Sequence, residues 1–327
     1  MVGKQRRQGV HSIKYKRGMV KMKRVLITGG TGSIGKAFIK ELYGTYEIHN
    51  LSRGGEGLVA LSREFPNVKN YLGSIEDKSF VLSSFRKVGP EIVVHFSAIK
   101  HVDFSERNPH LASKVNVLGS LNIAEASVTE DVPVTIGIST DKACWPENVY
   151  GYTKALMERS FISHSTLQNK FLVCRFANVA YSSGSVLKYW KSLAKDGRPL
   201  GLTDPNMNRL MFTKKDAVGL IKKAMAMAVS GEEGVVISQK MKCVNMLTLA
   251  EKISPDNIEI IGRRSGERCE EYLVHSSESK YVYIKNDLIL IKREVNPDEN
   301  EMPDGYSTVN ANKMSNEEMC LLINSQD

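Results

Sequence analysis

The sequence predicts an α/β protein built on a doubly wound parallel sheet, followed by a smaller C-terminal α/β lobe. Three observations support this prediction. Short apolar runs alternate with helix-length amphipathic segments from residue 23 to about residue 178, as they do in repeated strand–helix–strand units. A glycine-rich turn follows the first of these runs. After residue 178 the alternation ends, and loops with Pro199 and Pro205 separate shorter elements.

The predicted elements follow in chain order. Apolar and β-branched residues predict strands at 24–28, 47–51, 67–72, 91–96, 132–139 and 171–176. Amphipathic segments predict helices between them, at 33–43, 56–65, 76–88, 107–129 and 150–168. The second half is expected to hold helices at 186–195 and 214–229, a strand at 234–238, and polar turns at 262–267 and 296–305.

Composition excludes several classes of protein. The chain has 327 residues, of which 42% are hydrophobic and 25% are charged, which are ordinary globular values. No apolar run is long enough for a transmembrane helix, and no apolar core follows the basic N-terminus as it would in a secretory signal. The cysteines (Cys144, Cys174, Cys243, Cys269 and Cys320) form no CxxC pair, so neither a metal site nor disulfides are expected. We expect a cytoplasmic protein.

The net charge of +9 comes from one end of the chain. Residues 1–24 hold nine Lys and Arg and no Asp or Glu, so residues 25–327 are formally neutral. We therefore expect no nucleic-acid surface on the body of the protein. Residues 1–22 are interpreted as a basic, disordered tail, or as the result of a start codon assigned too early, because Met19 and Met22 precede the first strand.

The glycine-rich turn predicts a dinucleotide site. Gly29, Gly32 and Gly35 lie in the segment between the first strand and the first helix, which also holds Thr31, Ser33 and Ile34. Such a turn brings free backbone N–H groups and the positive end of a helix to a diphosphate, as in a Rossmann domain. The second strand ends in Ser52-Arg53 rather than in a carboxylate, which favours the 2′-phosphate of NADP over NAD. Further cofactor contacts are expected from Ser74, Ile75, Ser97 and Ala98.

A polar cluster follows the fifth predicted strand. It contains Thr140, Asp141 and Lys142, and eight residues later come Tyr150 and Lys154. Tyr150 and Lys154 are four residues apart, so they share one face of a helix. A nearby ammonium lowers the pKa of a phenol, so that Tyr150 can act as a base. In isolation such a pair is equally typical of a helix surface.

These motifs carry a family resemblance. The glycine turn with Tyr150 and Lys154 resembles the extended short-chain dehydrogenase/reductase superfamily. The stretch Ser139-Thr140-Asp141-Lys142 together with Asn148, and the later segments Arg175–Val179, Gly184–Val186 and Thr203–Arg209, are similar to the inverting UDP-N-acetylglucosamine 4,6-dehydratases of polysaccharide biosynthesis. The resemblance covers roughly residues 22–325. Ser74, Ala177 and Ser183 depart from the family pattern, and the departures lie mostly on the substrate side.

The resemblance implies a reaction and a role for each residue. Tyr150 would deprotonate the C4 hydroxyl while NADP takes the hydride, and Thr140 would orient that hydroxyl. Lys142 would be the base at C5 and Asp141 the acid for the C6 hydroxyl, with Lys154 supporting Tyr150. We expect burial and nearby cations to lower the pKa of Lys142. The implied substrate contacts are Lys100 (also near the cofactor), His101, Asn178, Ser185, Val186, Thr203, Arg209, Arg264 and Glu267.

The same reading divides the chain into parts. An NADP-binding domain is expected at 23–178, with 214–240 returning to it, and a UDP-sugar lobe at 179–213 and 241–327. Relatives form dimers to hexamers, so a homo-oligomer is expected. Two alternatives remain open: a nucleotide-sugar C4-epimerase or reductase, which needs no base at C5, and a non-catalytic NADP-binding sensor or scaffold.

Overall fold

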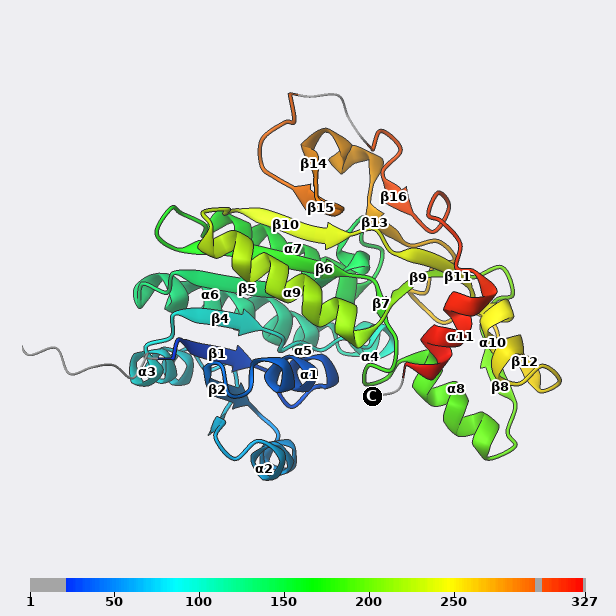
Figure 1. Cartoon of the computed structure of the whole chain (residues 1–327), viewed down its shortest axis with the longest axis horizontal. Coiled ribbons are helices and arrows are strands. Elements are labelled where there is room, and N and C mark those ends of the chain that lie inside the picture. The colour runs from blue at the N-terminus through cyan, green and yellow to red at the C-terminus, as the bar shows by residue number, and fades with distance from the viewer. Residues whose placement is uncertain (1–21, 298–301, 326–327) are drawn as a thin grey trace, which may run out of the picture.

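A nine-stranded sheet lies at the centre of the computed structural model, which describes residues 22–297 and 302–325 (Figure 1). Its strand order is β14-β15-β10-β6-β5-β4-β1-β2-β3. The pairings from β10 to β3 are parallel, whereas β14 and β15 add an antiparallel edge. The predicted doubly wound sheet is therefore confirmed. Residues 1–21 of the predicted basic tail lie outside the described residues.

The strands of this sheet are short, and the central ones are mostly apolar, whereas β2 and β3 carry several polar residues. Their bounds are β1 (Arg24–Thr28), β2 (Glu47–Ser52), β3 (Lys69–Leu72), β4 (Ile92–His95), β5 (Val134–Thr140), β6 (Lys170–Phe176), β10 (Val235–Gln239), β14 (Val282–Lys285) and β15 (Leu288–Ile291). The central strands are buried because helices cover both faces, and this explains their continuous apolar runs.

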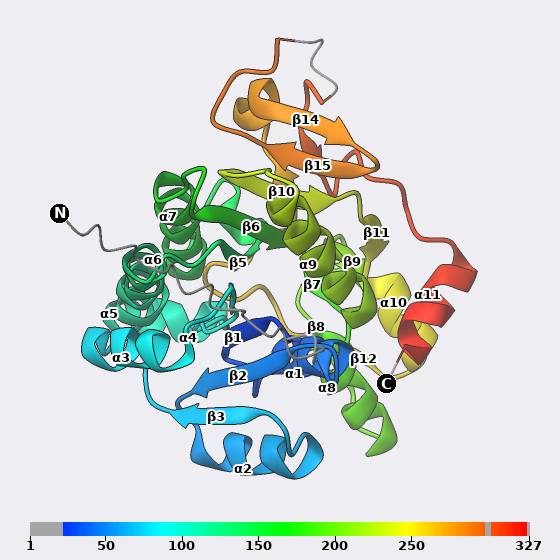
Figure 2. The same cartoon turned by 60° about the vertical axis from the view of Figure 1, so that its left-hand side comes forward.

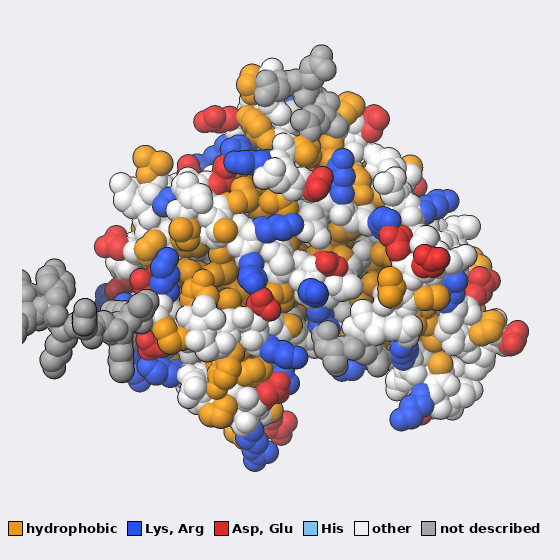
Figure 3. Space-filling view, in the orientation of Figure 1, with side chains coloured by type: hydrophobic (Ala, Val, Ile, Leu, Met, Phe, Trp, Pro, Cys, Tyr) orange, Lys and Arg blue, Asp and Glu red, His pale blue; other side chains and the backbone are white. Residues whose placement is uncertain are grey.

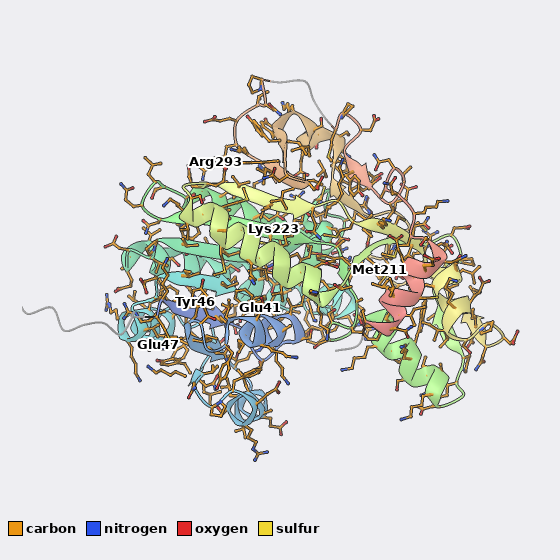
Figure 4. All side chains as sticks on the ribbon, viewed as in Figure 1. Glu41, Tyr46, Glu47, Met211, Lys223 and Arg293 are labelled. Carbon is orange, nitrogen blue, oxygen red and sulfur yellow. The ribbon has the colours of Figure 1, made fainter. Side chains whose placement is uncertain are left out.

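Helices cover the sheet on both sides (Figure 2). One face carries α3 (Lys78–Val88), α6 (Gly119–Thr129) and α7 (Val149–Ser163), and the other carries α1 (Ser33–Leu42) and α9 (Lys214–Val229). The helix α2 (Gly55–Glu64) lies beside β3. Figure 4 labels Glu41 on α1 and Lys223 on α9, whose neighbour Lys222 forms an ion pair with Glu41.

The helix predicted at 107–129 is interrupted. The helix α4 (Val102–Arg107) ends at the start of this range. It is followed by α5 (Pro109–Ser113), a π-helical turn (Lys114–Leu118) and α6. The π turn holds the buried Asn116, whose amide bonds both the N–H and the C=O of Ile99 and also the hydroxyl of Thr153 on α7. The extra residue in the turn thus aims a polar side chain at the loop after β4, which is a common reason for such bulges.

A smaller lobe lies beside the carboxyl ends of the strands. It contains β7 (Asn178–Val179), α8 (Val186–Lys195), β8 (Leu200–Leu202), β9 (Asn208–Phe212), β11 (Lys242–Asn245), α10 (Met246–Ile253), β12 (Ile258–Ile260), β13 (Tyr272–Val274), β16 (Tyr306–Ser307) and α11 (Asn316–Asn324). Its own core forms around Leu187, Trp190 and Leu249. Residues 282–291, grouped with this lobe in the sequence prediction, instead form β14 and β15 of the large sheet.

A buried arginine joins the large sheet to the C-terminal segment. Arg175 on β6 is 2% exposed, and its guanidinium bonds both carboxylate oxygens of Glu158 on α7. The same group bonds both oxygens of Glu278 in the 3₁₀ turn Ser276–Tyr281, and it donates to the carbonyl of Leu273 on β13. Such two-pronged contacts fix the orientation of α7 and β13 relative to β6.

Loss of this guanidinium should destabilise the fold strongly. We expect Arg175→Met to lower the free energy of unfolding by about 3–5 kcal/mol, because Glu158 and Glu278 would keep their burial without a counter-charge. Urea unfolding followed by circular dichroism measures the loss. The matched control is Arg86→Met, which breaks the surface pair with Glu130 and should cost about 0–1 kcal/mol. Equal losses in the two variants would contradict this account.

Candidate active site

A cavity of about 1050 Å³ opens at the carboxyl ends of β1, β2, β4 and β5. This edge of a doubly wound sheet is where ligands ordinarily bind. Its wall includes every residue that the sequence analysis named for the cofactor, the chemistry and the substrate. Met211, labelled in Figure 4 on β9, also lines it. Figure 3 shows the surface hollowed between the side that carries α1 and α2 and the side that carries α8.

The glycine turn is shaped to receive a diphosphate. Gly29 has a φ of +74°, and a Cβ there would lie 2.9 Å from the backbone nitrogen of Ser97. A Cβ on Gly35 would lie 2.7 Å from the carbonyl oxygen of Gly29, so only glycine lets α1 start this close to the turn. A Cβ on Gly32 would meet only that carbonyl oxygen, at 3.3 Å, and Gly32 lines the cavity. The residues therefore fit a dinucleotide, whose phosphates occupy such a cradle at a helix N-terminus.

The end of β2 holds the glycine turn in place. The side-chain oxygen of Asn50 accepts hydrogen bonds from the backbone N–H of Gly30 at 2.9 Å and from the Ser52 hydroxyl at 3.2 Å. The Asn50 amide in turn donates to Asn70 on β3. Arg53 follows on the exposed rim of the cavity. Asn50 thus has a positioning role that sequence reasoning missed, because only the pairing of β1 with β2 brings it to Gly30.

Two loops from opposite halves of the chain meet over the glycine turn. The backbone N–H of Ser183 donates to the Ser33 hydroxyl at 2.8 Å, and the Lys100 ammonium donates to the Ser183 carbonyl at 2.6 Å. A Cβ on Gly184 would lie 2.4 Å from the His101 ring, so that loop passes directly beside His101. Burial lowers the pKa of Lys100. The predicted contacts Ser185 and Val186 begin α8 at the same place.

The catalytic candidates lie on a tight turn and on the first turn of α7. Thr140 ends β5, and Asp141 and Lys142 form the 3₁₀ turn after it. A Cβ on Gly151 would lie 2.3 Å from the Lys142 carbonyl oxygen, so glycine allows α7 to pack on this turn next to Tyr150. The Thr140 hydroxyl donates to Asp141 Oδ1 at 2.8 Å. Thr140, Asp141, Tyr150 and Lys154 are buried, and Lys142 is partly exposed to the cavity.

Lys142 lies between two carboxylates. Its Nζ is 3.1 Å from Asp141 Oδ1 and 2.8 Å from Glu271 Oε1. Burial acts to lower the pKa of Lys142, but the charges of Asp141 and Glu271 outweigh it and raise that pKa above the ordinary value. The expected decrease is therefore wrong, since sequence spacing did not reveal that two carboxylates surround the amine.

The two carboxyl groups differ in their proton affinity. Burial and the negative charge of Glu271 raise the pKa of Asp141, although Lys142 opposes them. Burial also disfavours the charged form of Glu271, but Arg209 and Lys142 together lower its pKa. Asp141 Oδ2 is buried and has no hydrogen-bond partner among the described residues. Asp141 is thus the carboxyl group suited to hold a proton, and Glu271 the one suited to stay ionised.

The electrostatic surroundings of the phenol and the amine on α7 differ from those expected. Burial raises the pKa of Tyr150 to about 12, and the cation that opposes this rise is Lys142 rather than Lys154. Burial lowers the pKa of Lys154 to about 7, against the influence of Glu158 one turn further along α7. The helix geometry is as predicted, with both side chains facing inward. The ammonium that acts on the phenol, however, comes from the neighbouring turn.

The substrate-side residues converge on Glu271. Asn178 donates to Glu271 Oε2 at 2.7 Å, and Arg209 Nε lies 3.3 Å from Glu271 Oε1. Arg209 Nη2 also lies 3.6 Å from Glu267. Arg264 is exposed at the rim, where its backbone N–H donates to Glu267, and Thr203 lines the cavity nearby. Asn178 and Arg209 therefore contact a carboxylate that the sequence analysis did not select, and Glu267 contacts Arg209.

Glu271 could be recognised only from tertiary structure. The sequence contains the adjacent pair Glu270-Glu271 before a short apolar stretch, which leaves open which carboxylate turns inward. Pairing of β13 with β16 decides this, because it leaves Glu270 exposed and Glu271 buried. Within residues 22–297 and 302–325 no group of His, Cys, Asp and Glu is arranged to hold a metal ion. None of the helices in these ranges is long and apolar enough to cross a membrane.

Comparison with known proteins agrees with this geometry. A family model described as polysaccharide biosynthesis protein matches residues 25–293. The chain is 37% identical over 278 residues to an uncharacterized membrane protein of Methanocaldococcus jannaschii, with 79% of this chain and 82% of that one covered. It is 32% identical over 276 residues to the UDP-N-acetylglucosamine 4,6-dehydratase (inverting) of Campylobacter jejuni, covering 81% of each. It is also 34% identical over 275 residues to a UDP-glucose 4-epimerase of Rickettsia akari, covering 78% of this chain and 79% of that one.

A solved structure shares nearly the whole architecture. The X-ray structure of Pen from Bacillus thuringiensis superposes with a TM-score of 0.82 at 29% identity, covering 93% of this chain and 98% of that chain. The match therefore includes both the large sheet and the smaller lobe. From the family match over most of its length, the chain belongs to the polysaccharide biosynthesis protein family, a branch of the extended short-chain dehydrogenase/reductases.

Proposed function

We propose that this protein is an NADP-dependent nucleotide-sugar 4,6-dehydratase that acts on UDP-N-acetylglucosamine and inverts C5. One observation carries the proposal: Lys142 and Asp141 are in direct contact beside Tyr150, in the cavity that also contains the glycine turn. An amine and a carboxyl group at one place suit a reaction that removes a proton and a hydroxyl group from neighbouring carbons. Family relatives named as sugar dehydratases and epimerases support an enzyme of this class.

The glycine turn, Ser52 and Arg53 would hold the cofactor. The diphosphate would lie at the N-terminus of α1, and Lys154 and Tyr150 would face the nicotinamide ribose. The Ser52 hydroxyl already donates to Asn50, so the guanidinium of Arg53 is the main donor for a 2′-phosphate. A bound nicotinamide supplies the hydride acceptor for C4 and later the hydride donor for C6. The expected homo-oligomer stays a prediction.

Proton removal at C4 falls to Tyr150. Its phenolate would take the proton of the C4 hydroxyl, and the positive charge of the neighbouring Lys142 ammonium lowers the free-energy cost of forming that phenolate. The Thr140 hydroxyl, which is 2.8 Å from Asp141 Oδ1, would orient the sugar hydroxyl. Once C4 is a ketone, the C5 proton is acidic enough for an amine to remove it.

A proton shift within the Lys142–Asp141 pair prepares the elimination. Lys142 enters as an ammonium and Asp141 as a carboxylate, 3.1 Å apart. Transfer of one proton along this contact gives a neutral amine and a protonated acid without changing the net charge. The amine then takes the C5 proton, and Asp141 gives its proton to the C6 hydroxyl, which leaves as water. The pair thereby returns to its initial ionic form.

The same amine can complete the reaction. After hydride returns to C6, the Lys142 ammonium would donate a proton to C5. The lysine side chain is long and lines the cavity. It can therefore deliver this proton to the face of C5 opposite to the face from which the first proton was removed. This accounts for inversion at C5. This last step leaves Lys142 as a neutral amine, and the proton that Tyr150 took from the C4 hydroxyl would pass to this amine, which restores the phenolate and the ammonium. Over the whole cycle one water leaves, the hydride that left C4 arrives at C6, and every proton is accounted for.

A C4-epimerase is the second candidate, favoured by the similarity to a UDP-glucose 4-epimerase. That reaction removes and returns a hydride at C4 alone. It needs no base at C5, so substitution of Lys142 distinguishes the two functions.

The first prediction concerns the products. Incubation with UDP-N-acetylglucosamine in D₂O should give a product that has lost one water and carries deuterium at C5, as read by mass spectrometry and NMR. Lys142→Ala should slow water loss by about 10²–10⁴-fold, because the base is gone, while Lys78→Ala on the surface of α3 should have no effect. An unchanged mass with inversion at C4 would instead establish the epimerase.

A second prediction concerns the phenol. Tyr150→Phe should slow formation of the 4-keto sugar by about 10²–10⁴-fold, because the C4 hydroxyl loses its base. The absorbance at 340 nm of the reduced nicotinamide, recorded after substrate is added to enzyme in excess, follows this step in a single turnover. Tyr152→Phe, two residues away and exposed, is the matched control. Equal rates for Tyr150→Phe and wild type would remove Tyr150 from the mechanism.

A third prediction concerns cofactor choice. Arg53→Ala should weaken NADPH binding by about tenfold or more while leaving NADH binding nearly unchanged, because only NADPH carries the 2′-phosphate. Fluorescence titration of the two reduced cofactors gives both dissociation constants. Arg63→Ala on α2 tests for a general effect of removing positive charge. Tighter binding of NADH than NADPH by the wild type would overturn the NADP preference.

A further inference from the structure

The buried carboxylate of Glu271 connects the substrate side of the cavity to the catalytic turn. Its Oε1 lies 2.8 Å from Lys142 Nζ and 3.3 Å from Arg209 Nε, and its Oε2 accepts from Asn178 at 2.7 Å. The side chain is 5% exposed. Three donors from three separate elements therefore end on a single carboxylate.

The backbone of Glu271 is fixed independently of these donors. Its N–H donates to the Thr308 hydroxyl at 3.2 Å, and its carbonyl accepts from the Thr308 N–H at 3.0 Å. These bonds hold the residue against the segment that follows β16. The main chain that carries the carboxylate is thus held by contacts of its own, as a group that orients another side chain requires.

We propose that Glu271 is a positioning residue of the dehydration step, which fixes the amine of Lys142 beside Asp141 and retains a proton on that pair. The role rests on the proposed function, since it concerns the acid and base of that reaction. It assigns Glu271 no contact with the reacting atoms. The carboxylate acts through Lys142 by a direct ion pair and through Asp141 by its charge.

Electrostatics gives the proposal its direction. Burial lowers the pKa of Lys142, whereas the charge of Glu271 raises it. For Asp141, burial and the charge of Glu271 both raise the pKa. The other charged or titratable groups around the pair are Arg209 on β9, Tyr150 on α7, and Glu267 and Cys243 around Arg209. Removal of the Glu271 charge should therefore let both Lys142 and Asp141 release protons at lower pH.

The reaction has a use for this retained proton. Asp141 needs a proton for the departing C6 hydroxyl, and an isolated aspartate is almost fully ionised at neutral pH. A permanently ionised neighbour raises the proton affinity of Asp141 without competing for the proton, because Arg209 and Lys142 keep Glu271 charged. The two carboxyl groups thus have separate tasks, and the titration belongs to the coupled pair.

The decisive test measures the amine directly. Brief labelling with acetic anhydride across a range of pH, followed by peptide mass spectrometry, gives the titration curve of Lys142 in the whole protein. Glu271→Gln keeps the shape of the side chain and should move this curve to lower pH by about one unit, which is roughly a tenfold rise in labelling on the acid side of the curve. Glu270→Gln, the exposed neighbour, should leave the curve in place. An unmoved Lys142 curve in Glu271→Gln overturns the proposal.

A second variant guards against misfolding of Glu271→Gln. Arg209 lowers the pKa of Lys142, so Arg209→Gln should move the labelling curve in the opposite direction, to higher pH. If Glu271→Gln has lost its circular dichroism spectrum, this variant decides. A curve for Arg209→Gln that coincides with wild type, or moves to lower pH, contradicts the proposed charge coupling.

Activity supplies a separate readout. The pH profile of water loss from UDP-N-acetylglucosamine should move to lower pH in Glu271→Gln, whereas a merely structural role would lower the rate equally at every pH. A uniform loss overturns the proposal. If the wild type dehydrates no nucleotide sugar, the proposed function fails, and the labelling curves still decide whether Glu271 holds the proton on the pair.

Discussion

The contact of one amine with two carboxylates governs this site. Lys142 carries the positive charge that makes it possible to bury Asp141 and Glu271 at the edge of the sheet. Burial of either carboxylate alone would be costly. The cost is offset here because Arg209 and Asn178 satisfy the remaining bonds of Glu271. For the proposed reaction, the result would be a preorganised acid and base that can exchange a proton without changing the net charge of the pair.

This arrangement depends on how firmly two parts of the chain are joined. Arg175 ties β6 to α7 and to the turn after β13, so Glu271, which directly precedes β13, keeps its distance from the helix that carries Tyr150. Asn148 makes a second connection, since it caps α7 through Gly151 and donates to the carbonyl of Gly266. Rigid joints of this kind allow a cavity of about 1050 Å³ to hold the side chains of its wall in fixed positions.

The loop before α8 is also joined to the glycine turn and to the loop after β4. The Ser183 N–H bonds the Ser33 hydroxyl at the start of α1, and Lys100 bonds the carbonyl of Ser183. The loop before α8 therefore contacts the glycine turn that would hold the diphosphate of a dinucleotide.

Much of the fold and most of the cavity wall could be predicted from the sequence alone. Strand and helix positions follow from local apolar periodicity, and the Gly29–Gly35 turn, Tyr150 and Lys142 follow from spacing along the chain. Three features could not be predicted in this way: the selection of Glu271 over Glu270, the break in the helix around Asn116, and the raised pKa of Lys142. The physical reason is the same for each. Residue types and short spacings determine local structure, whereas burial and charge at a point in space depend on side chains that only the folded chain brings together.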